Sequence, residues 1–476
     1  MPASVEEVVI QEKSLSLGSD DEDPNAEFGG TEARKALEKR LLLKLDLRMS
    51  TTIFVIYILN IIDRNNAGAA RLRDFEKDLH LKGQEFATLL SILYVGYIVM
   101  QVPSNMFLNY VGRPSLYLPI CMMIWGMISC LTGIAKNFVG ALLTRFFLGF
   151  VEAAFFPGAL FLLSKWYKRE ELGSRTALLF CGNIISGAFG ALIASGILEG
   201  LQGKLGHAAW RWLFYIEGSL TIFVAALAIF ILPDFPSTTR WLTPQERALA
   251  LKRMEEDVGV GDQEETENRG NGLWLAMKDW KVWWLALILA SQAVTLSFNA
   301  YFPTLTATLG YDPTVSLLLV APPLVFGALF ALVWAWHSDK TQERFWHMSV
   351  AFGLGTLGFI ISISTLNTAA RYVSMFLMAQ SFVGVAVTFA WTSNTLPRPP
   401  SKRAVTLALT NAFAQLGNVA GSYVWPKMWG PSYRYSYAIC IATGGWAVVM
   451  GWILRMHLKR RNAQFASSKQ TFRYLL

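Results

Sequence analysis

Four ionisable residues stand inside two strongly apolar segments of this 476-residue chain. Asp63 and Arg64 are neighbours in the first segment, whereas Arg145 and Glu152 lie seven residues apart in the second. Seven residues make two turns of an α-helix, so Arg145 and Glu152 share one helix face. An ionisable group in hydrocarbon costs a few kcal/mol, so each one needs a partner or a function. Two cations and two carboxylates together predict a site that holds an anion and exchanges a proton.

The depth of these residues favours one shared site. With a rise of about 1.5 Å per residue, Arg64 lies about 9 Å short of the far edge of a ~30 Å hydrocarbon core. The second helix runs in the opposite direction and places Arg145 about 11 Å from the same edge, with Glu152 about 10 Å nearer the other face. We therefore expect Arg64 and Arg145 at similar depth.

A purely structural role for the four charges is the alternative. Buried ion pairs, Asp63 with Arg145 or Arg64 with Glu152, could hold the two helices in register. Buried pairs stabilise weakly, however, because desolvation offsets most of the attraction. An arginine is in contrast well suited to a substrate carboxylate, which its planar guanidinium binds through two hydrogen bonds. We therefore favour the functional interpretation.

The elements that must position these residues are membrane-spanning helices. Hydrophobic residues make up 53% of the chain and charged residues only 16%, against about 25% charged residues in a typical soluble domain. Too few polar side chains exist to cover a soluble surface. A spanning helix needs about 20 mostly apolar residues, and we expect twelve, at 49–68, 86–107, 116–134, 138–162, 176–199, 211–232, 282–303, 315–336, 346–366, 371–393, 404–425 and 435–456.

The predicted fold is therefore all-α, a polytopic membrane protein with two six-helix halves. The first half covers 46–232 and the second covers 282–457, and a polar central loop at 233–281 separates them. Residues 1–45 are acidic and polar at their start and are predicted to form a disordered tail. A second tail follows at 458–476.

The distribution of Lys and Arg predicts the orientation. With an even number of spans both termini lie on one side, and that side carries 30 of the 42 Lys and Arg residues, against 10 on the opposite side and two inside spans. Cytosolic loops carry the excess of positive charge in membrane proteins, so both termini are predicted to be cytosolic. The same topology explains the net charge of +8 without a nucleic-acid partner.

Catalysis and metal binding are not indicated. The four cysteines lie in apolar runs, and none of the five histidines has the spacing of a metal or acid–base site. The sequence shows neither a Ser/His/Asp arrangement nor a phosphate-binding loop. We expect no enzyme activity and no cofactor, with the proton as the coupling ion.

Short motifs in a fixed order along the chain resemble one transporter family. They lie at 44–48, 63–68, 101–105, 145–158, 210–218, 232–236, 301–304, 321–323 and 338–340, with Arg344. In this order they resemble the major facilitator superfamily, and within it the anion:cation symporter family in its fungal allantoate-permease-like branch. The resemblance runs from about Leu41 to Arg461.

The resemblance implies the major facilitator fold and proton-coupled import of a small organic anion, such as nicotinate, allantoate or pantothenate. It implies that Asp63 and Glu152 couple the proton and that Arg64 and Arg145 bind the substrate. We also expect a protein that acts as a monomer in the lipid bilayer, with the plasma membrane as its location. A nutrient sensor on a transporter fold, or an uncoupled facilitator or exchanger, is the alternative.

Polar residues on other helices extend the predicted site. A polar residue of the fifth helix faces the cavity in the family, and Asn183 is the nearest candidate here. In the second half, Asn394, Asn411 and Asn418 are equally compatible with substrate contact and with hydrogen bonding between helices.

The resemblance also points to a gate on the cytosolic side. Asp339, Lys340 and Arg344 match the gating charges of the second half. The equivalent place in the first half, at 109–113, lacks the usual acidic residue. Gating is therefore expected to depend mainly on the second half.

Overall fold

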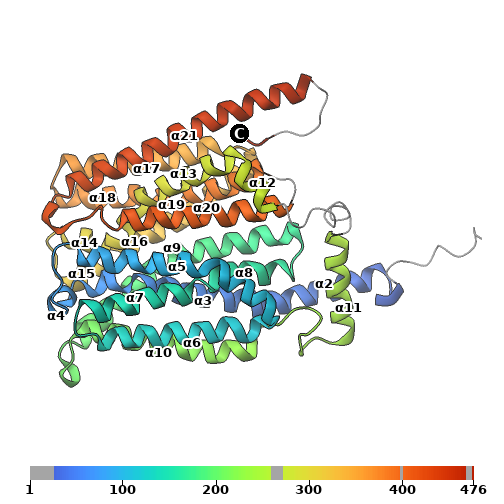
Figure 1. Ribbon diagram of the computed structural model, residues 1–476, viewed down its shortest axis with the longest axis horizontal. Coiled ribbons are helices and arrows are strands. Elements are labelled where there is room, and N and C mark those ends of the chain that lie inside the picture. The colour runs from blue at the N-terminus through green and yellow to red at the C-terminus, as the bar shows by residue number, and fades with distance from the viewer. Residues whose placement is uncertain (1–25, 259–271, 397–399, 468–473) are drawn as a thin grey trace, which may run out of the picture.

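The computed structural model describes residues 26–258, 272–396, 400–467 and 474–476. These residues form helices and turns without a strand, and the long helices lie side by side in one bundle (Figure 1). Without water, a backbone must satisfy its hydrogen bonds within the segment, which is why apolar spans are helical. Parts of the predicted tails and central loop lie outside the described residues, at 1–25, 259–271 and 468–473.

The first half contains six membrane-length helices in seven pieces. A turn at Ala153 and Ala154 divides the fourth of them into α7 and α8. The pieces are α3 (Thr51–Ala70), α5 (Glu85–Val111), α6 (Pro114–Ile134), α7 (Phe138–Glu152), α8 (Phe155–Ser164), α9 (Arg169–Gly200) and α10 (Ala209–Ile231). Short helices complete this half at η1 (Ala26–Phe28), η2 (Asp46–Ser50), α4 (Phe75–Asp78) and η3 (Lys204–Gly206).

The second half repeats this plan with more interruptions. Its helices are α13 (Trp280–Thr295), η4 (Leu296–Tyr301), α14 (Phe302–Ala307), α15 (Pro313–Leu318), α16 (Ala321–Thr341), α17 (Phe345–Ser364), α18 (Thr368–Ala379), α19 (Ser381–Thr395), α20 (Pro400–Gly421), η5 (Lys427–Trp429) and α21 (Arg434–Ser467). In the sequence, helices α11 (Pro244–Val258) and α12 (Gly272–Lys278) come between the two halves.

Eleven helical segments of the described residues are long and apolar enough to cross a membrane, against twelve predicted. The remaining predicted span, at 404–425, corresponds to α20. This helix packs against α13 and α5 like a member of the bundle. Its polar residues make it less apolar than the other eleven segments: Thr406, Thr410, Asn411, Gln415 and Asn418.

The predicted disorder of residues 1–45 is wrong for part of the segment, because Thr31–Leu45 form helix α2. Ionic contacts hold this helix against α11 and α9. The guanidinium of Arg253 on α11 is 1% exposed and donates hydrogen bonds to Glu38 on α2 and Glu171 on α9. This charged helix is therefore stabilised by ion pairs with residues distant in the sequence, which a local hydrophobic pattern does not reveal.

The two ends of the bundle differ in how the halves meet. We call the end with α2 and α11 the tail end, and the opposite end the α4 end (Figure 1). At the α4 end one buried apolar cluster joins both halves, with Phe75 and Trp210 packed near Tyr301 and Trp425. Toward the tail end the buried apolar residues form two clusters, one with Trp166 in the first half and one with Trp391 in the second, against which Ile184 of α9 packs.

Polar contacts between the halves also lie at the α4 end. They join Arg71 to Thr304, Arg73 and Ser195 to Thr314, Lys427 to Glu76, and both Thr88 and Ser91 to Tyr423. The halves are therefore closed against each other at the α4 end.

Two glycines let helices α5 and α7 pack so closely that their backbones touch. A Cβ at Gly149 would lie 1.9 Å from the carbonyl oxygen of Leu93, and one at Gly96 would lie 2.3 Å from that of Phe146. Small residues permit such close packing of membrane helices. This contact fixes the α7 helix, and with it Arg145 and Glu152.

Gly149→Ala is expected to destabilise the protein by about 1–3 kcal/mol, because the added methyl group meets a backbone carbonyl that cannot rotate away. The matched control is Gly196→Ala on α9, where no atom lies within 4 Å of the new Cβ. Alanine favours the helix there by up to about 1 kcal/mol. Thermal unfolding of the purified variants measures the difference. Equal effects at both positions would contradict the proposed close contact.

Candidate functional site

Arg64 and Glu152 form an ion pair between α3 and α7. The Nε and Nη2 atoms of Arg64 each lie 3.0 Å from Oε2 of Glu152. Glu152 is fully buried, and the guanidinium of Arg64 also lies over the ring of Tyr97, 5.0 Å from its centroid. One of the two pairings considered from the sequence is thus present.

Asp63 has a different environment from Glu152. Its carboxylate is completely buried and accepts hydrogen bonds from Ser129 on α6, at 3.3 Å, and from Thr221 on α10, at 2.8 Å. The alternative ion pair of Asp63 with Arg145 is absent from the described structure. Two neutral hydroxyl groups, rather than a cation, therefore hold this carboxylate.

Arg145 is a buried cation that makes no salt bridge within the described residues. Its side chain is 1% exposed, and its guanidinium donates hydrogen bonds to the backbone carbonyl oxygens of Asp63, at 3.4 Å, and Arg64, at 3.1 Å. The Nε atom has no hydrogen-bond partner in the described part of the chain. Contact with the α3 backbone at residue 64 confirms that Arg145 and Arg64 lie at similar depth.

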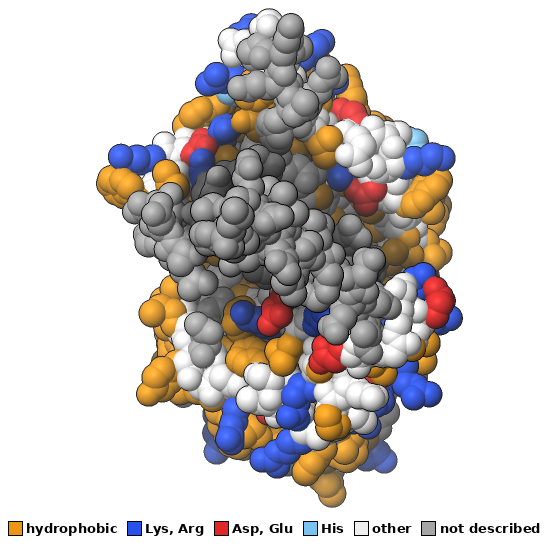
Figure 2. All heavy atoms as spheres, turned by 90° about the vertical axis from the view of Figure 1, so that its right-hand side faces the viewer, with side chains coloured by type: hydrophobic (Ala, Val, Ile, Leu, Met, Phe, Trp, Pro, Cys, Tyr) orange, Lys and Arg blue, Asp and Glu red, His pale blue; other side chains and the backbone are white. Residues whose placement is uncertain are grey.

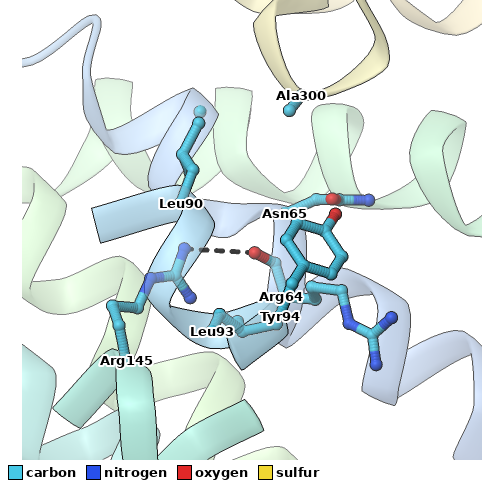
Figure 3. A pocket seen from close by; sticks show the side chains of 8 residues that line it. Arg64, Asn65, Leu90, Leu93, Tyr94, Arg145 and Ala300 are labelled. Atoms are coloured by element: carbon cyan, nitrogen blue, oxygen red, sulfur yellow. Dashed lines mark hydrogen bonds between the residues drawn. The ribbon is translucent and has the colours of Figure 1, made fainter. Parts of the chain in front are cut away.

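A cavity lies beside the two arginines. Its lining comes from α3, α5, α7 and η4 and consists of Arg64, Asn65, Gly68, Leu90, Leu93, Tyr94, Arg145 and Ala300. Figure 3 shows the guanidinium of Arg145 directed at the backbone of Arg64, while the guanidinium of Arg64 points away from it. Because Ala300 belongs to the second half, the cavity lies between the halves.

A second cavity adjoins the first and reaches α9 and α10. It shares Asn65 and Ala300 with the first cavity and is otherwise lined by Ile62, Asn66, Ala69, Ser186, Gly187, Gly190, Ala191, Ala194, Glu217, Asn299, Phe302, Pro303, Val320 and Leu324. Most of these side chains are apolar. Glu217 is the one charged residue among them.

Three of the five predicted substrate-binding residues line neither cavity, and the predicted proton-coupling residues Asp63 and Glu152 do not line them either. Asn183 is exposed on α9, one turn before the cavity-lining Ser186 and Gly187. Asn394 is partly buried next to the last residue of α19. Asn411 accepts a 3.5 Å hydrogen bond from Gln415 one turn further along α20.

Among the described residues, the predicted gate residues all make their contacts within the second half. Arg344 pairs with Asp339 at 2.7 Å and donates to the hydroxyl of Ser338 at 2.9 Å. Lys340 is exposed and lies over the ring of Trp336. These contacts do not join the halves, which agrees with the separate apolar clusters at this end, and the gating role stays a prediction.

The prediction omitted Glu217 and Asn66, which are 3% and 4% exposed in the second cavity. The signal was present for Glu217, a carboxylate inside the sixth apolar segment. Its position about two turns from the start of that segment suggests the mouth of the helix when the sequence is considered alone. Packing of α10 against α3 instead buries it near Asp63.

Two helical halves, with a cavity between them that borders buried charges of the first half, form the arrangement of a membrane transporter. The family model of the Major Facilitator Superfamily matches residues 53–422. The chain therefore belongs to this superfamily, whose members are transporters rather than enzymes.

Fungal transporters are similar over most of the chain. The MFS-type transporter cnsO of Penicillium expansum is 33% identical over 430 residues, which cover 87% of this chain and 82% of that protein. The MFS-type transporter efuF of Hormonema carpetanum is 29% identical over 463 residues, with 94% and 92% covered.

Solved transporter structures share the fold. A bacterial homolog of the human lysosomal transporter Spinster, in an inward-facing and occupied conformation, has a TM-score of 0.65 at 16% identity and covers 85% of this chain and 95% of that chain. A D-xylose-proton symporter has a TM-score of 0.64 at 16% identity, with 85% and 97% covered. At these identities the likeness concerns the fold alone.

The Arg64–Glu152 pair should show strong energetic coupling. Glu152→Gln or Arg64→Gln alone leaves a buried charge without its partner. Each is expected to lower the free energy of unfolding by about 3 kcal/mol, which is the low end for buried pairs, because Arg64 is partly exposed. The loss of unfolding free energy in the double variant should be smaller, by at least about 1 kcal/mol, than the sum of the losses in the two single variants. Denaturant unfolding of all four proteins measures this. Additive losses would show that the pair does not interact energetically.

Proposed function

We propose that this protein is a secondary active transporter that carries a small organic anion together with protons. The observation that carries the proposal is the buried guanidinium of Arg145, which makes no ion pair within the described residues and borders a cavity. An isolated buried charge costs several kcal/mol. A carboxylate of the substrate would supply the missing partner through charge-assisted hydrogen bonds.

The two carboxylates near this cation suit proton coupling. Glu152 binds Arg64 in the present state, so a proton on Glu152 would release that arginine toward the anion. Asp63, held by Thr221 and Ser129, can accept or lose a proton without breaking an ion pair. A neutralised site could then pass between the two orientations of the halves. The narrower anion:cation symporter branch is part of this proposal and depends on the sequence motifs.

We also propose that the tail end faces the cytosol, where the Lys and Arg excess would place it. Basic side chains surround this end (Figure 2). Exposed basic residues in the segments that reach this end include Arg113, Lys165, Arg240, Lys340 and Lys459. With the α4 end closed, the described conformation is then inward-facing. We further propose that the protein resides in the plasma membrane and functions as a monomer.

Arg145→Gln is expected to weaken binding of small monocarboxylates about 100-fold, because it removes charged hydrogen bonds worth about 1.5–3 kcal/mol each. The ligand-free variant should be at least as stable as the wild type, since an unpaired buried cation is lost. Isothermal titration against a panel of carboxylates and sulfonates measures binding. Arg240→Gln, an exposed arginine, is the control. Unchanged affinity in Arg145→Gln would refute the anion site.

Proton coupling is tested in proteoliposomes. The wild type should accumulate the anion when an inward proton gradient is imposed. Glu152→Gln should lose this accumulation yet still exchange internal for external anion, because its substrate-binding arginines remain. If anion uptake by the wild type does not depend on the proton gradient, the protein is a facilitator or exchanger instead.

A further inference from the structure

Two histidines join α16 and α17 near the tail end. They lie ten residues apart in the sequence, yet Nδ1 of His337 is 2.7 Å from Nε2 of His347. His337 is exposed one turn before the end of α16, whereas His347 is 6% exposed in the first turn of α17. The indole of Trp334 lies against both rings and donates its Nε1–H to the backbone oxygen of His347, at 3.0 Å. The packing of both helices therefore holds the rings in contact.

A hydrogen bond between two imidazole rings depends on their protonation. One ring nitrogen must donate and the facing one must accept, which a neutral pair and a pair with one added proton both allow. When both rings are charged, all four nitrogens are donors, and the facing nitrogens can no longer stay 2.7 Å apart. Histidine is the side chain whose charge changes between about pH 5 and 8. The contact is therefore present at neutral pH and is lost when the surroundings become acidic.

Charged neighbours favour one proton on this pair and oppose a second. Oε2 of Glu343, in the turn between the helices, lies 3.5 Å from Nδ1 of His347, so this carboxylate stabilises a single positive charge on the pair. The other oxygen of Glu343 faces Nε of Arg455 on α21, at 3.6 Å. Because this arginine already shares the carboxylate, a second charge on the rings is opposed both by the first ring and by Arg455. Repulsion then acts against the contact of α16 with α17.

The turn that the two rings close carries the predicted gate residues. Ser338 directly follows His337 in the sequence. Its hydroxyl accepts a hydrogen bond from Arg344, at 2.9 Å, and donates one to the backbone oxygen of Glu343, at 2.7 Å. Arg344 also forms the ion pair with Asp339, at 2.7 Å. A movement of His337 away from α17 therefore acts on the residues that hold the gate charges in place.

Other contacts hold this turn without the histidines. The backbone oxygen of Leu476 accepts hydrogen bonds from the N–H groups of Arg344, at 2.6 Å, and Phe345, at 3.3 Å. The ammonium group of Lys340 lies over the ring of Trp336, 5.1 Å from its centroid. Because these contacts do not involve an imidazole, mild acid acts on the turn through the ring pair.

We propose that His337 and His347 form a pH-sensitive latch on the predicted cytosolic gate, which opens when a second proton binds to the pair. The inference rests on the proposed function for its cytosolic orientation, but it needs neither an anion nor Arg145. An acidified cytosol then loosens the turn that carries the gate charges, in a protein proposed to bring protons into that compartment. The acidification that proton import causes thus acts back on the gate.

Amide hydrogen–deuterium exchange of the purified protein without substrate tests the latch. Protection factors, which correct for the intrinsic pH dependence of exchange, are compared at about pH 7.5 and about pH 5.5, across the range in which histidine titrates. In the wild type, protection of the amides at 338–348 should fall about fivefold in acid, as expected for the loss of one hydrogen bond.

Three variants identify the group responsible. His337→Gln leaves only one ring to be charged and should show the same protection at both pH values. His337→Lys carries a permanent charge beside His347 and should show low protection at both. His207→Gln, at an exposed histidine after η3, is the control and should keep the fall of the wild type.

Three results would overturn the latch. The first is a wild type whose protection at 338–348 is the same at both pH values. The second is a fall of the same size in His337→Gln, which would assign the effect to another group. The third is a His337→Lys variant as well protected as the wild type at neutral pH. Since no substrate is present, failure here leaves the anion site untouched, and Arg145→Gln tests that site separately.

Discussion

A buried cation without a carboxylate partner is the constraint on which this structure depends. Arg145 cannot lose its proton under ordinary conditions, so its charge must be balanced by neighbouring dipoles or by a ligand. Among the described residues, the guanidinium of Arg145 donates hydrogen bonds to two backbone carbonyl oxygens and makes no salt bridge, whereas the nearby Arg64 pairs with Glu152. A cavity adjoins the unbalanced charge. In the proposed function, an anion that binds Arg145 would regain the stability lost by burying this charge.

The fold provides this arrangement through close helix packing and through the junction of the halves. Gly96 and Gly149 bring α5 and α7 to backbone contact and so fix the helix that carries Arg145 and Glu152. At the α4 end, a shared apolar cluster and contacts such as Arg71 to Thr304 keep the halves together. The cavities lie beside that closed junction, where rocking of the halves would open or close access to them.

Helical spacing and depth were enough to predict that Asp63, Arg64, Arg145 and Glu152 lie close together, and the helical fold of two halves followed from hydropathy. Their shared functional role stays a prediction. The actual pairing was beyond the sequence, because Asp63 finds Thr221 on a helix distant in the chain. The same reason explains why the sequence alone suggests a helix end for Glu217 and disorder for the residues that form α2. Asn183 is predicted as a cavity residue from its position along the fifth span alone. The sequence does not fix how that helix is rotated, and the structure turns Ser186 toward the cavity instead.

The most direct measurement is a structure of the protein with its tightest-binding small carboxylate. The account predicts that the carboxylate oxygens lie at about 2.7–2.9 Å from the guanidinium of Arg145, the distance of a charge-assisted hydrogen bond, inside the cavity between the halves. A ligand bound elsewhere, with Arg145 paired instead to Asp63 or Glu152, would contradict the central claim.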